Sequence, residues 1–160
     1  MALTKINNNT LSAITGLPAG VGGKVLQVVY SSTSTAVSTT GTTLIDTGLT
    51  GAITPSSTSS KVLVLVNHAD NNKNGGDGSQ KIQLFRGTTS ILQFALNLNN
   101  TGSSIEQRSE TGCNFLDTPN TTSATTYKTQ MARNGSGGTV TVQTNGCTST
   151  MTLMEIAGWL

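Results

Sequence analysis

The sequence has 160 residues, of which 10% are charged and 4% aromatic, with a formal net charge of +2. Its nine basic residues form no cluster, and with so few aromatic side chains this argues against binding nucleic acid through phosphates or stacked bases. No apolar stretch reaches the length of a membrane span, and the first ten residues lack the apolar core of a signal peptide. We therefore expect no membrane partner, and a protein made and used, or assembled, in a cytoplasm.

Polarity comes from hydroxyl and amide side chains, including 29 Thr and 17 Ser. Threonine favours strands because its branched Cβ fits a pleated surface, whereas Ser, Asn and Gly favour turns. Ala, Leu, Glu and Lys are too sparse for sustained helical patterns. The composition therefore predicts short strands joined by polar turns within one domain.

The first 23 residues differ from the rest of the chain. They contain an Asn triplet, isolated aliphatic residues and then a Pro- and Gly-rich stretch that breaks a helix and forms a hinge. Isolated aliphatic side chains cannot form a core of their own, but they can dock on another protein and become ordered there. We predict an extended N-terminal arm over residues 1–23 whose docking residues are Leu3, Ile6, Leu11, Ile14 and Leu17. A frayed terminus is the alternative.

From Lys24 onward, nine β-rich segments alternate with turn segments rich in Gly, Pro and Asn. The predicted strands cover residues 24–30, 42–49, 61–68, 80–86, 90–98, 112–117, 125–133, 139–144 and 149–157. Since no helical pattern separates these strands, we predict an all-β fold, an antiparallel jelly roll or β-sandwich over residues 24–160.

The strongest predicted strand is apolar on both of its faces. Its alternating side chains are Val62, Val64 and Val66 on one face and Leu63 and Leu65 on the other. An antiparallel strand with one face in water should instead alternate apolar and polar residues. We therefore predict a self-assembly face at residues 62–66, covered by a neighbouring subunit in a closed cyclic assembly. A loop or the N-terminal arm folded over the sheet is the alternative cover.

Few residues are candidates for chemistry. His68 is the only imidazole, and no serine or cysteine pattern beside it suggests a nucleophile pair. The acidic residues are scattered, and the chain lacks the aromatic residues that sugar subsites of a glycosidase use. We therefore expect His68 on the surface or at a strand end, no catalytic residue and no enzymatic activity.

Residues 70–81 match the first half of a calcium-binding loop. Asp70, Asn72 and Asn74 have the spacing of alternating oxygen ligands, and a glycine that permits a sharp bend follows them. However, Lys81 occupies the position where such a loop needs a bidentate glutamate. We therefore predict a solvated hairpin loop rather than a metal site.

Two cysteines, Cys113 and Cys147, together with one histidine are too few to complete a four-ligand zinc site. They can pair as a disulfide if they lie on neighbouring strands, but the lack of a secretion signal favours two buried free thiols. We expect no metal and no cofactor.

Four segments of the sequence resemble virion proteins of tailed bacteriophages: GKVLQVVYSSTSTAVSTT, SSTSSKVLVLVNH, KIQLFRGTTSIL and STMTLMEIAGWL. The resemblance extends over residues 23–160 and rests on strand texture and on recurring KVL and MEI phrases. Such proteins include capsid decoration (cement) proteins, head fibres and tail-fibre tips, and their domains are often trimeric jelly rolls of the tumour-necrosis-factor-like type.

The resemblance implies a homotrimer on the capsid surface of a virion, assembled in the host cytoplasm, with the major capsid protein as partner. In one interpretation the protein is a capsid decoration protein whose arm docks on the capsid and stabilises the head. In the alternative it is a receptor- or glycan-binding tip of a phage head or tail fibre. The isolated apolar residues of the arm favour the capsid decoration protein. The low aromatic content counts against a glycan-binding tip, in which aromatic side chains would stack on sugars.

Overall fold

The computed structural model of the protein describes residues 25–101 and 104–158. The predicted docking residues of the arm lie outside this part of the chain: Leu3, Ile6, Leu11, Ile14 and Leu17. In the described residues, no helix is long and apolar enough to cross a membrane.

The described residues form ten strands and one short 3-10 turn, η1 (Thr144–Gly146). The strands are β1 (Val25–Thr33), β2 (Val37–Thr39), β3 (Ile45–Ile53), β4 (Lys61–Asn74), β5 (Ser79–Arg86), β6 (Thr89–Leu98), β7 (Gln107–Asp117), β8 (Thr125–Asn134), β9 (Thr139–Val142) and β10 (Ser149–Ile156). All nine predicted strands are present. The three-residue β2 was not predicted because it lies in a Ser- and Thr-rich stretch with the composition of a turn.

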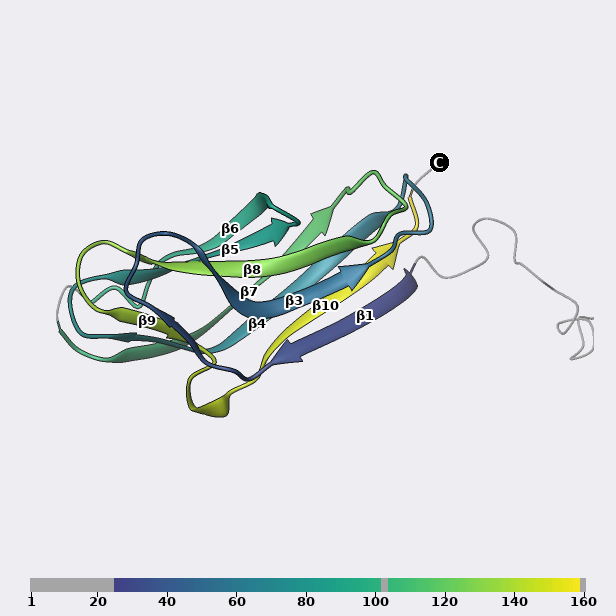
Figure 1. Ribbon diagram of the computed structural model, residues 1–160. Helices are drawn as coiled ribbons and strands as arrows, with labels where there is room; N and C mark the ends of the chain where they lie inside the picture. The colour runs from purple at the N-terminus through teal and green to yellow at the C-terminus, as the bar shows by residue number, and fades with distance from the viewer. Residues whose placement is uncertain (1–24, 102–103, 159–160) are drawn as a thin grey trace, which may run out of the picture.

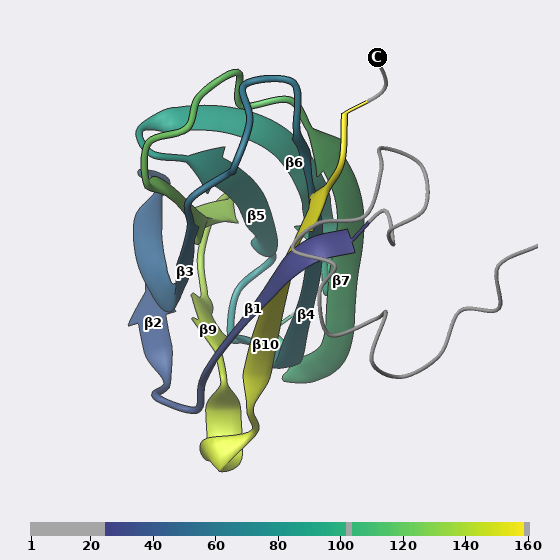
Figure 2. The same ribbon diagram turned by 90° about the vertical axis from the view of Figure 1, so that its right-hand side faces the viewer.

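Two antiparallel sheets pack face to face (Figure 1). The first has the order β1-β10-β4-β9-β2. In it, β10 and β9 pair with successive parts of one edge of β4, and β7 pairs with the opposite edge. The second sheet has the order β3-β8-β5-β6. The chain crosses repeatedly from one sheet to the other, so that β1-β10-β4-β7 lies opposite β3-β8-β5-β6 (Figure 2). This double Greek-key arrangement of eight main strands is a jelly roll, and it confirms the predicted all-β sandwich.

The hydrophobic core lies between the two sheets. Val62 and Val64 of β4 and Leu153 of β10 are completely buried, and they pack in one cluster with Tyr127 of β8. A smaller cluster further along the sandwich contains Ile82, Ala95, Met131 and Val142. Along β10 and the first half of β4, every second residue points into the core, as the period-2 geometry of a strand requires.

Glycines allow two turns to touch at one end of the sandwich. The β4–β5 turn (75–78) lies against the β8–β9 turn (135–138), and the Ser136 Oγ lies 3.0 Å from Asp77 Oδ1. Gly138 has a φ of +84°, and a Cβ at this position would overlap the carbonyl oxygen of Gly75. Any larger residue would therefore have to separate the two turns.

We expect Gly138→Ala to lower the free energy of unfolding by about 3 kcal/mol, because it combines left-handed backbone strain with a steric clash. Gly146→Ala is the matched control. Gly146 has a similar φ of +73°, but nothing lies within 4 Å of its Cβ position, so only the strain of about 1–2 kcal/mol remains. Urea denaturation of both variants measures the difference, and equal losses would show that the two turns do not depend on their contact.

Candidate interaction surface

The outward side of β1, β10, β4 and β7 carries a row of apolar side chains. The pairing register places Val28 opposite Met154, Met154 opposite Leu63, and Leu63 opposite Leu116. Residues that face each other across strands point to the same side of the sheet, so these four side chains form one line across four strands. Val28 and Leu116, at the ends of this line, are 56% and 51% exposed.

Flanking rows extend this apolar line over the sheet. On one side Val25 pairs with Ile156, and on the other Tyr30 lies in line with Thr152 and Leu65. We call this surface the outer face, and it comprises Val25, Val28, Tyr30, Leu63, Leu65, Leu116, Met154 and Ile156. None of these side chains is charged, and one charged residue, Lys61, lies opposite Ile156 at the edge of the face. Large apolar patches of this kind on a sheet mark surfaces that another molecule covers.

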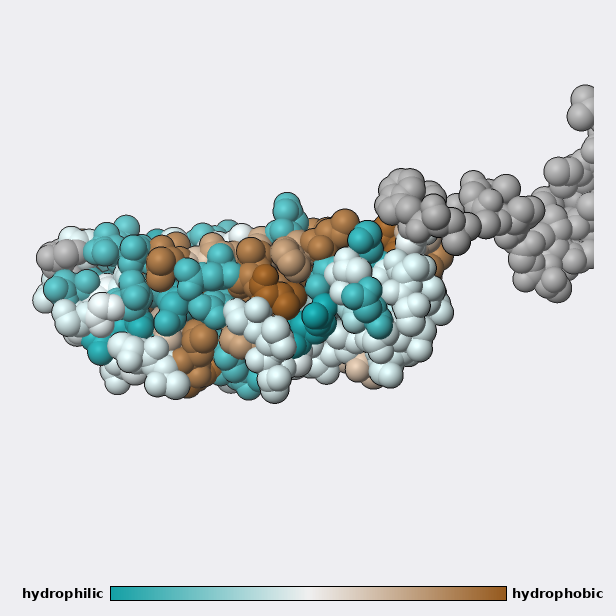
Figure 3. Space-filling model, turned by 90° about the horizontal axis from the view of Figure 1, so that it is seen from above, coloured by the Kyte–Doolittle hydropathy of each residue, from teal (hydrophilic) through white to brown (hydrophobic). Residues whose placement is uncertain are grey.

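A second apolar region lies where the edge strands of the two sheets, β6 and β7, come together. It comprises half-buried side chains and the 51% exposed Leu96, and we call it the β6–β7 margin: Ile91, Phe94, Leu96, Cys113 and Phe115. Seen from above, hydrophobic residues form several separate patches along the molecule, with hydrophilic and intermediate residues between them (Figure 3). The molecule thus has two different apolar surfaces.

At the edge of the sandwich away from β6 and β7, where β1 of the first sheet lies beside β3 of the second, polar contacts join the two sheets. The Gln27 amide of β1 donates to the Thr54 carbonyl at 2.7 Å and to Glu155 Oε2 at 2.8 Å. The Ser56 amide N–H and hydroxyl donate to Glu155 Oε1 at 2.7 and 2.6 Å. Burial alone would raise the pKa of Glu155, but these hydrogen bonds to its carboxylate lower it to about 2. The Glu155 carboxylate thus connects β1 and β10 to the segment that follows β3.

The predicted self-assembly face divides between the core and the surface. Val62, Val64 and Val66 point into the sandwich and are at most 5% exposed, so they are core residues. Leu63 and Leu65 point outward and are half-buried, and they form the centre of the outer face. Their neighbours on β1, β7 and β10 were not identified from the sequence, because only the strand register brings them alongside β4.

The prediction for His68 was wrong, because the ring is completely buried rather than at the surface. It lies between the sheets, where its Nε2 is 2.9 Å from the Thr129 hydroxyl of β8. Its aromatic ring stacks on Phe94 with a centroid distance of 6.3 Å. Desolvation lowers the pKa of His68 to about 4, so the ring is neutral near pH 7.

The hairpin predicted at 70–81 is mostly strand. Asn71, Asn72 and Lys73 are buried within β4, and only residues 75–78 form the turn. The first potential calcium ligand is already paired, since Asp70 Oδ2 accepts a hydrogen bond from Arg108 at 2.8 Å. The described residues contain no group of three His, Cys, Asp or Glu that could hold a metal ion.

Both cysteines are free thiols, but only one of them is shielded from solvent. Cys113 is half-buried in the β6–β7 margin, and desolvation raises the pKa of its thiol to about 11. Cys147 is exposed, contrary to the prediction of two buried thiols. The Cys113 thiol is therefore not placed as an activated nucleophile.

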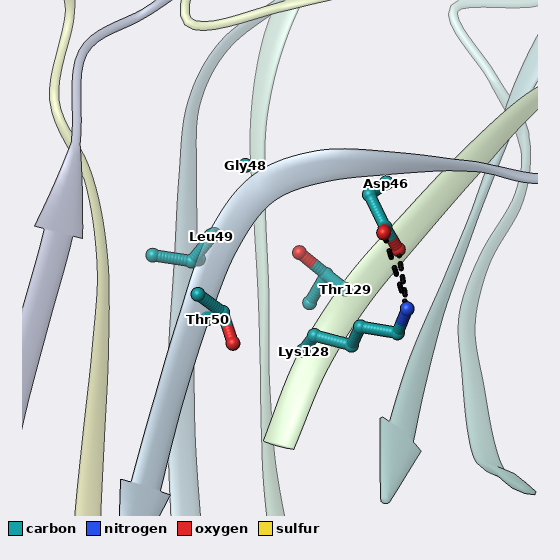
Figure 4. Close-up of a pocket in the computed structure, with 6 residues that line it drawn as sticks. All are labelled: Asp46, Gly48, Leu49, Thr50, Lys128 and Thr129. Carbon is teal, nitrogen blue, oxygen red and sulfur yellow. Dashed lines mark hydrogen bonds and ion pairs between the residues drawn. The ribbon is translucent and has the colours of Figure 1, made fainter. Parts of the chain in front are cut away.

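A small pocket lies on the second sheet, where β3 bends past β8 (Figure 4). It is lined by Asp46, Gly48, Leu49, Thr50, Lys128 and Thr129. Its two charges neutralise each other, because Lys128 Nζ lies 2.8 Å from Asp46 Oδ1. Hydrogen bonds from Lys128 and Gln130 lower the pKa of Asp46, so this carboxylate is a poor general base at neutral pH. The outer face and the β6–β7 margin are stronger candidates for function.

No family model and no curated protein sequence matches the chain. Solved structures with a similar fold include the crystal structure of the infectious bursal disease virus VP2 subviral particle, with 12% sequence identity and a TM-score of 0.43. That match covers 82% of this chain and 38% of the other. The structure of the infectious bursal disease virus Gx strain also matches, with 12% identity and a TM-score of 0.41, over 83% of this chain and 37% of the other. The chain thus spans less than two fifths of either matched chain.

Proposed function

We propose that this protein is a non-enzymatic virion subunit, a capsid decoration protein that assembles with copies of itself through the outer face. The observation that carries the proposal is the uncharged apolar row from Val28 to Leu116 across four strands. Covering a side chain of this size contributes up to about 1.5–3 kcal/mol when it is completely removed from water. A face with several such side chains therefore gains most from a permanent partner.

The partner that we propose for this face is a second copy of the chain. The β6–β7 margin is also apolar and includes Phe94 and Phe115, so one copy can place its margin on the outer face of the next. Because the two surfaces differ, this contact is heterologous, and it leads to a ring where the rotation closes. We propose a ring of three copies, in line with the resemblance to trimeric jelly rolls of phage virions.

The second partner in the proposal is the major capsid protein, bound through residues 1–23. The described chain begins at Val25, which pairs with Ile156 at the end of β10. Both ends of the described chain therefore leave the sandwich at the same end. We assign no part of this attachment to the turns at residues 75–78 and 135–138, which contact each other. The jelly roll supplies self-association, and residues 1–23 supply the attachment.

Solution mass and particle binding test the two halves of the proposal. By light scattering we expect the full chain and a variant lacking residues 1–22 to have the mass of a trimer, and only the full chain to bind capsids of the same virus. A monomeric full chain contradicts self-assembly, and equal capsid binding by the two proteins contradicts docking by the arm. Binding to host cells or their surface polysaccharide, without capsid binding, would instead identify a fibre tip.

A further inference from the structure

The buried His68 belongs to a hydrogen-bonded chain that connects the two sheets. Its Nε2 lies 2.9 Å from Thr129 Oγ1 of the second sheet, and that oxygen lies 2.6 Å from Thr47 Oγ1 of β3. Thr47, His68 and Thr129 are all completely buried. The ring therefore holds a polar connection across a region from which water is excluded.

On its other side the ring faces an amide that determines which nitrogen carries the proton. The Gln143 side chain forms hydrogen bonds with all its polar neighbours when its oxygen accepts from His68 Nδ1 at 3.2 Å and from Ser149 Oγ at 2.9 Å. Its side-chain nitrogen then donates to the carbonyls of Thr35 and Val142. Nδ1 is thus the donor and Nε2 the acceptor, which describes a neutral imidazole.

The side chains that face the ring cannot neutralise a second proton. Thr129 approaches from β8, Gln143 from the segment before η1 and Phe94 from β6, and none of them is acidic. The acidic residues on neighbouring elements are engaged elsewhere. Asp46 of β3 pairs with Lys128 of β8, and Asp70 of β4 pairs with Arg108 of β7. Asp117 of β7 pairs with Arg86, Glu155 of β10 accepts from Ser56, and Glu110 of β7 is exposed. The hydroxyl groups can rotate to accept a proton, but an imidazolium would remain a buried charge without a counterion.

We propose that His68 is an acid sensor, whose protonation weakens the contact between the two sheets and opens the β6–β7 margin. The margin is affected because Phe94 stacks directly on the ring and is part of that margin. If the margin joins neighbouring copies, as the proposed function holds, mild acid also separates the assembly. Only this last consequence rests on the proposed function.

The direction of the effect follows from the two states of the ring. The unfolded chain binds a proton near the ordinary histidine pKa of 6.5, whereas burial lowers the pKa of folded His68 to about 4. Stability is therefore unaffected above pH 6.5 and decreases as the pH falls from 6.5 towards 4. Over the interval from pH 6.5 to 5, the unfolding equilibrium constant should increase about fifteenfold, before most carboxylates begin to titrate.

His68 is the only histidine of the chain, so its titration can be followed without ambiguity. We expect urea denaturation of the full chain to show the fifteenfold increase of about one order of magnitude, and the His68→Gln variant to show no such increase over the same interval. The NMR signal of the single imidazole should titrate well below pH 5 in the folded protein. This measurement on the unmodified protein decides the question even if His68→Gln does not fold.

Titration of folded His68 near pH 6.5, or equal pH dependence of the two proteins, would overturn the sensor. Light scattering of the full chain, at pH 7.5 and at a pH where the NMR signal shows His68 to be protonated, reports separately on the assembly. A monomer at pH 7.5 would contradict the proposed function alone, because the NMR titration does not depend on association. A trimer at pH 7.5 that remains intact when His68 is protonated would overturn the inferred opening of the margin.

Discussion

Leu63→Arg is expected to convert the assembled protein into a folded monomer. Leu63 lies at the centre of the outer face, between Met154 on β10 and Leu116 on β7. An arginine there would place an unpaired charge in the middle of an apolar contact, where single residues often dominate the binding energy. We expect association to weaken by roughly 4 kcal/mol, or about a thousandfold in the dissociation constant. Sedimentation equilibrium measures the change.

The fold should tolerate this substitution, because Leu63 is only half-buried and points away from the core. A matched control is Thr126→Arg, which places the same side chain at an exposed position of β8 on the second sheet. We expect this control to keep the mass of the wild-type protein, and both variants to keep its melting temperature within a few degrees. A Leu63→Arg protein that still assembles, or a control that dissociates, would show that another surface joins the copies.

The alternation of side chains along β4 could be predicted from the sequence, but its environment could not. The two-faced pattern of residues 61–66 predicted that both faces need a cover. The valines are covered by the second sheet, and the leucines belong to a face that also draws on β1, β7 and β10. That face depends on pairings between segments far apart in the chain, and local periodicity contains no information about them.

The continuation of β4 through the Asn-rich stretch was hidden by its composition. Asn, Lys and Gly at 71–76 indicate a loop by residue preference. In the structure Asn71 donates to the His68 carbonyl at 3.0 Å, and Asn72 donates to Glu106 at 2.5 Å, while the backbone pairs with β7 and β9. Tertiary hydrogen bonds therefore outweigh the local preference.

Strand β6 shows a second limit of pattern reasoning. Strict alternation places Leu96 with Phe94 on one face, yet Leu96 is 51% exposed whereas Ala95 is buried. The pairing with β5 shifts at three positions along this strand, and each bulge changes which side chains point inward. His68 was likewise misplaced, because its partners Thr129 and Gln143 lie far away in the sequence.

A further contact that the sequence does not indicate closes one end of the sandwich. Asp117, at the end of β7, is 7% exposed and accepts hydrogen bonds from Arg86 of β5 at 2.8 Å and from the Tyr127 hydroxyl of β8 at 2.7 Å. Burial and the adjacent carboxylate raise the pKa of Tyr127, so its hydroxyl remains a donor. One carboxylate of the first sheet thus holds two side chains of the second.

Asp117→Asn is expected to lower the free energy of unfolding by about 3 kcal/mol. The substitution keeps the shape of the side chain but removes the charge that pairs with Arg86, and removal of one partner of a buried pair is costly. Because the Arg86 side chain is 33% exposed, water compensates part of its charge, and we expect the loss at the lower end of the range for buried pairs. Urea denaturation at neutral pH measures it.

The exposed pair of Asp46 and Lys128 supplies the control for this measurement. Asp46→Asn removes an ion pair with a similar distance of 2.8 Å, but the Asp46 side chain is 57% exposed, so its loss should cost less than about 1 kcal/mol. In a Tyr127→Phe background the cost of Asp117→Asn should decrease by about 1 kcal/mol, since one of the two hydrogen bonds is already absent. Equal costs for Asp117→Asn and Asp46→Asn would mean that Asp117 does not hold the two sheets together.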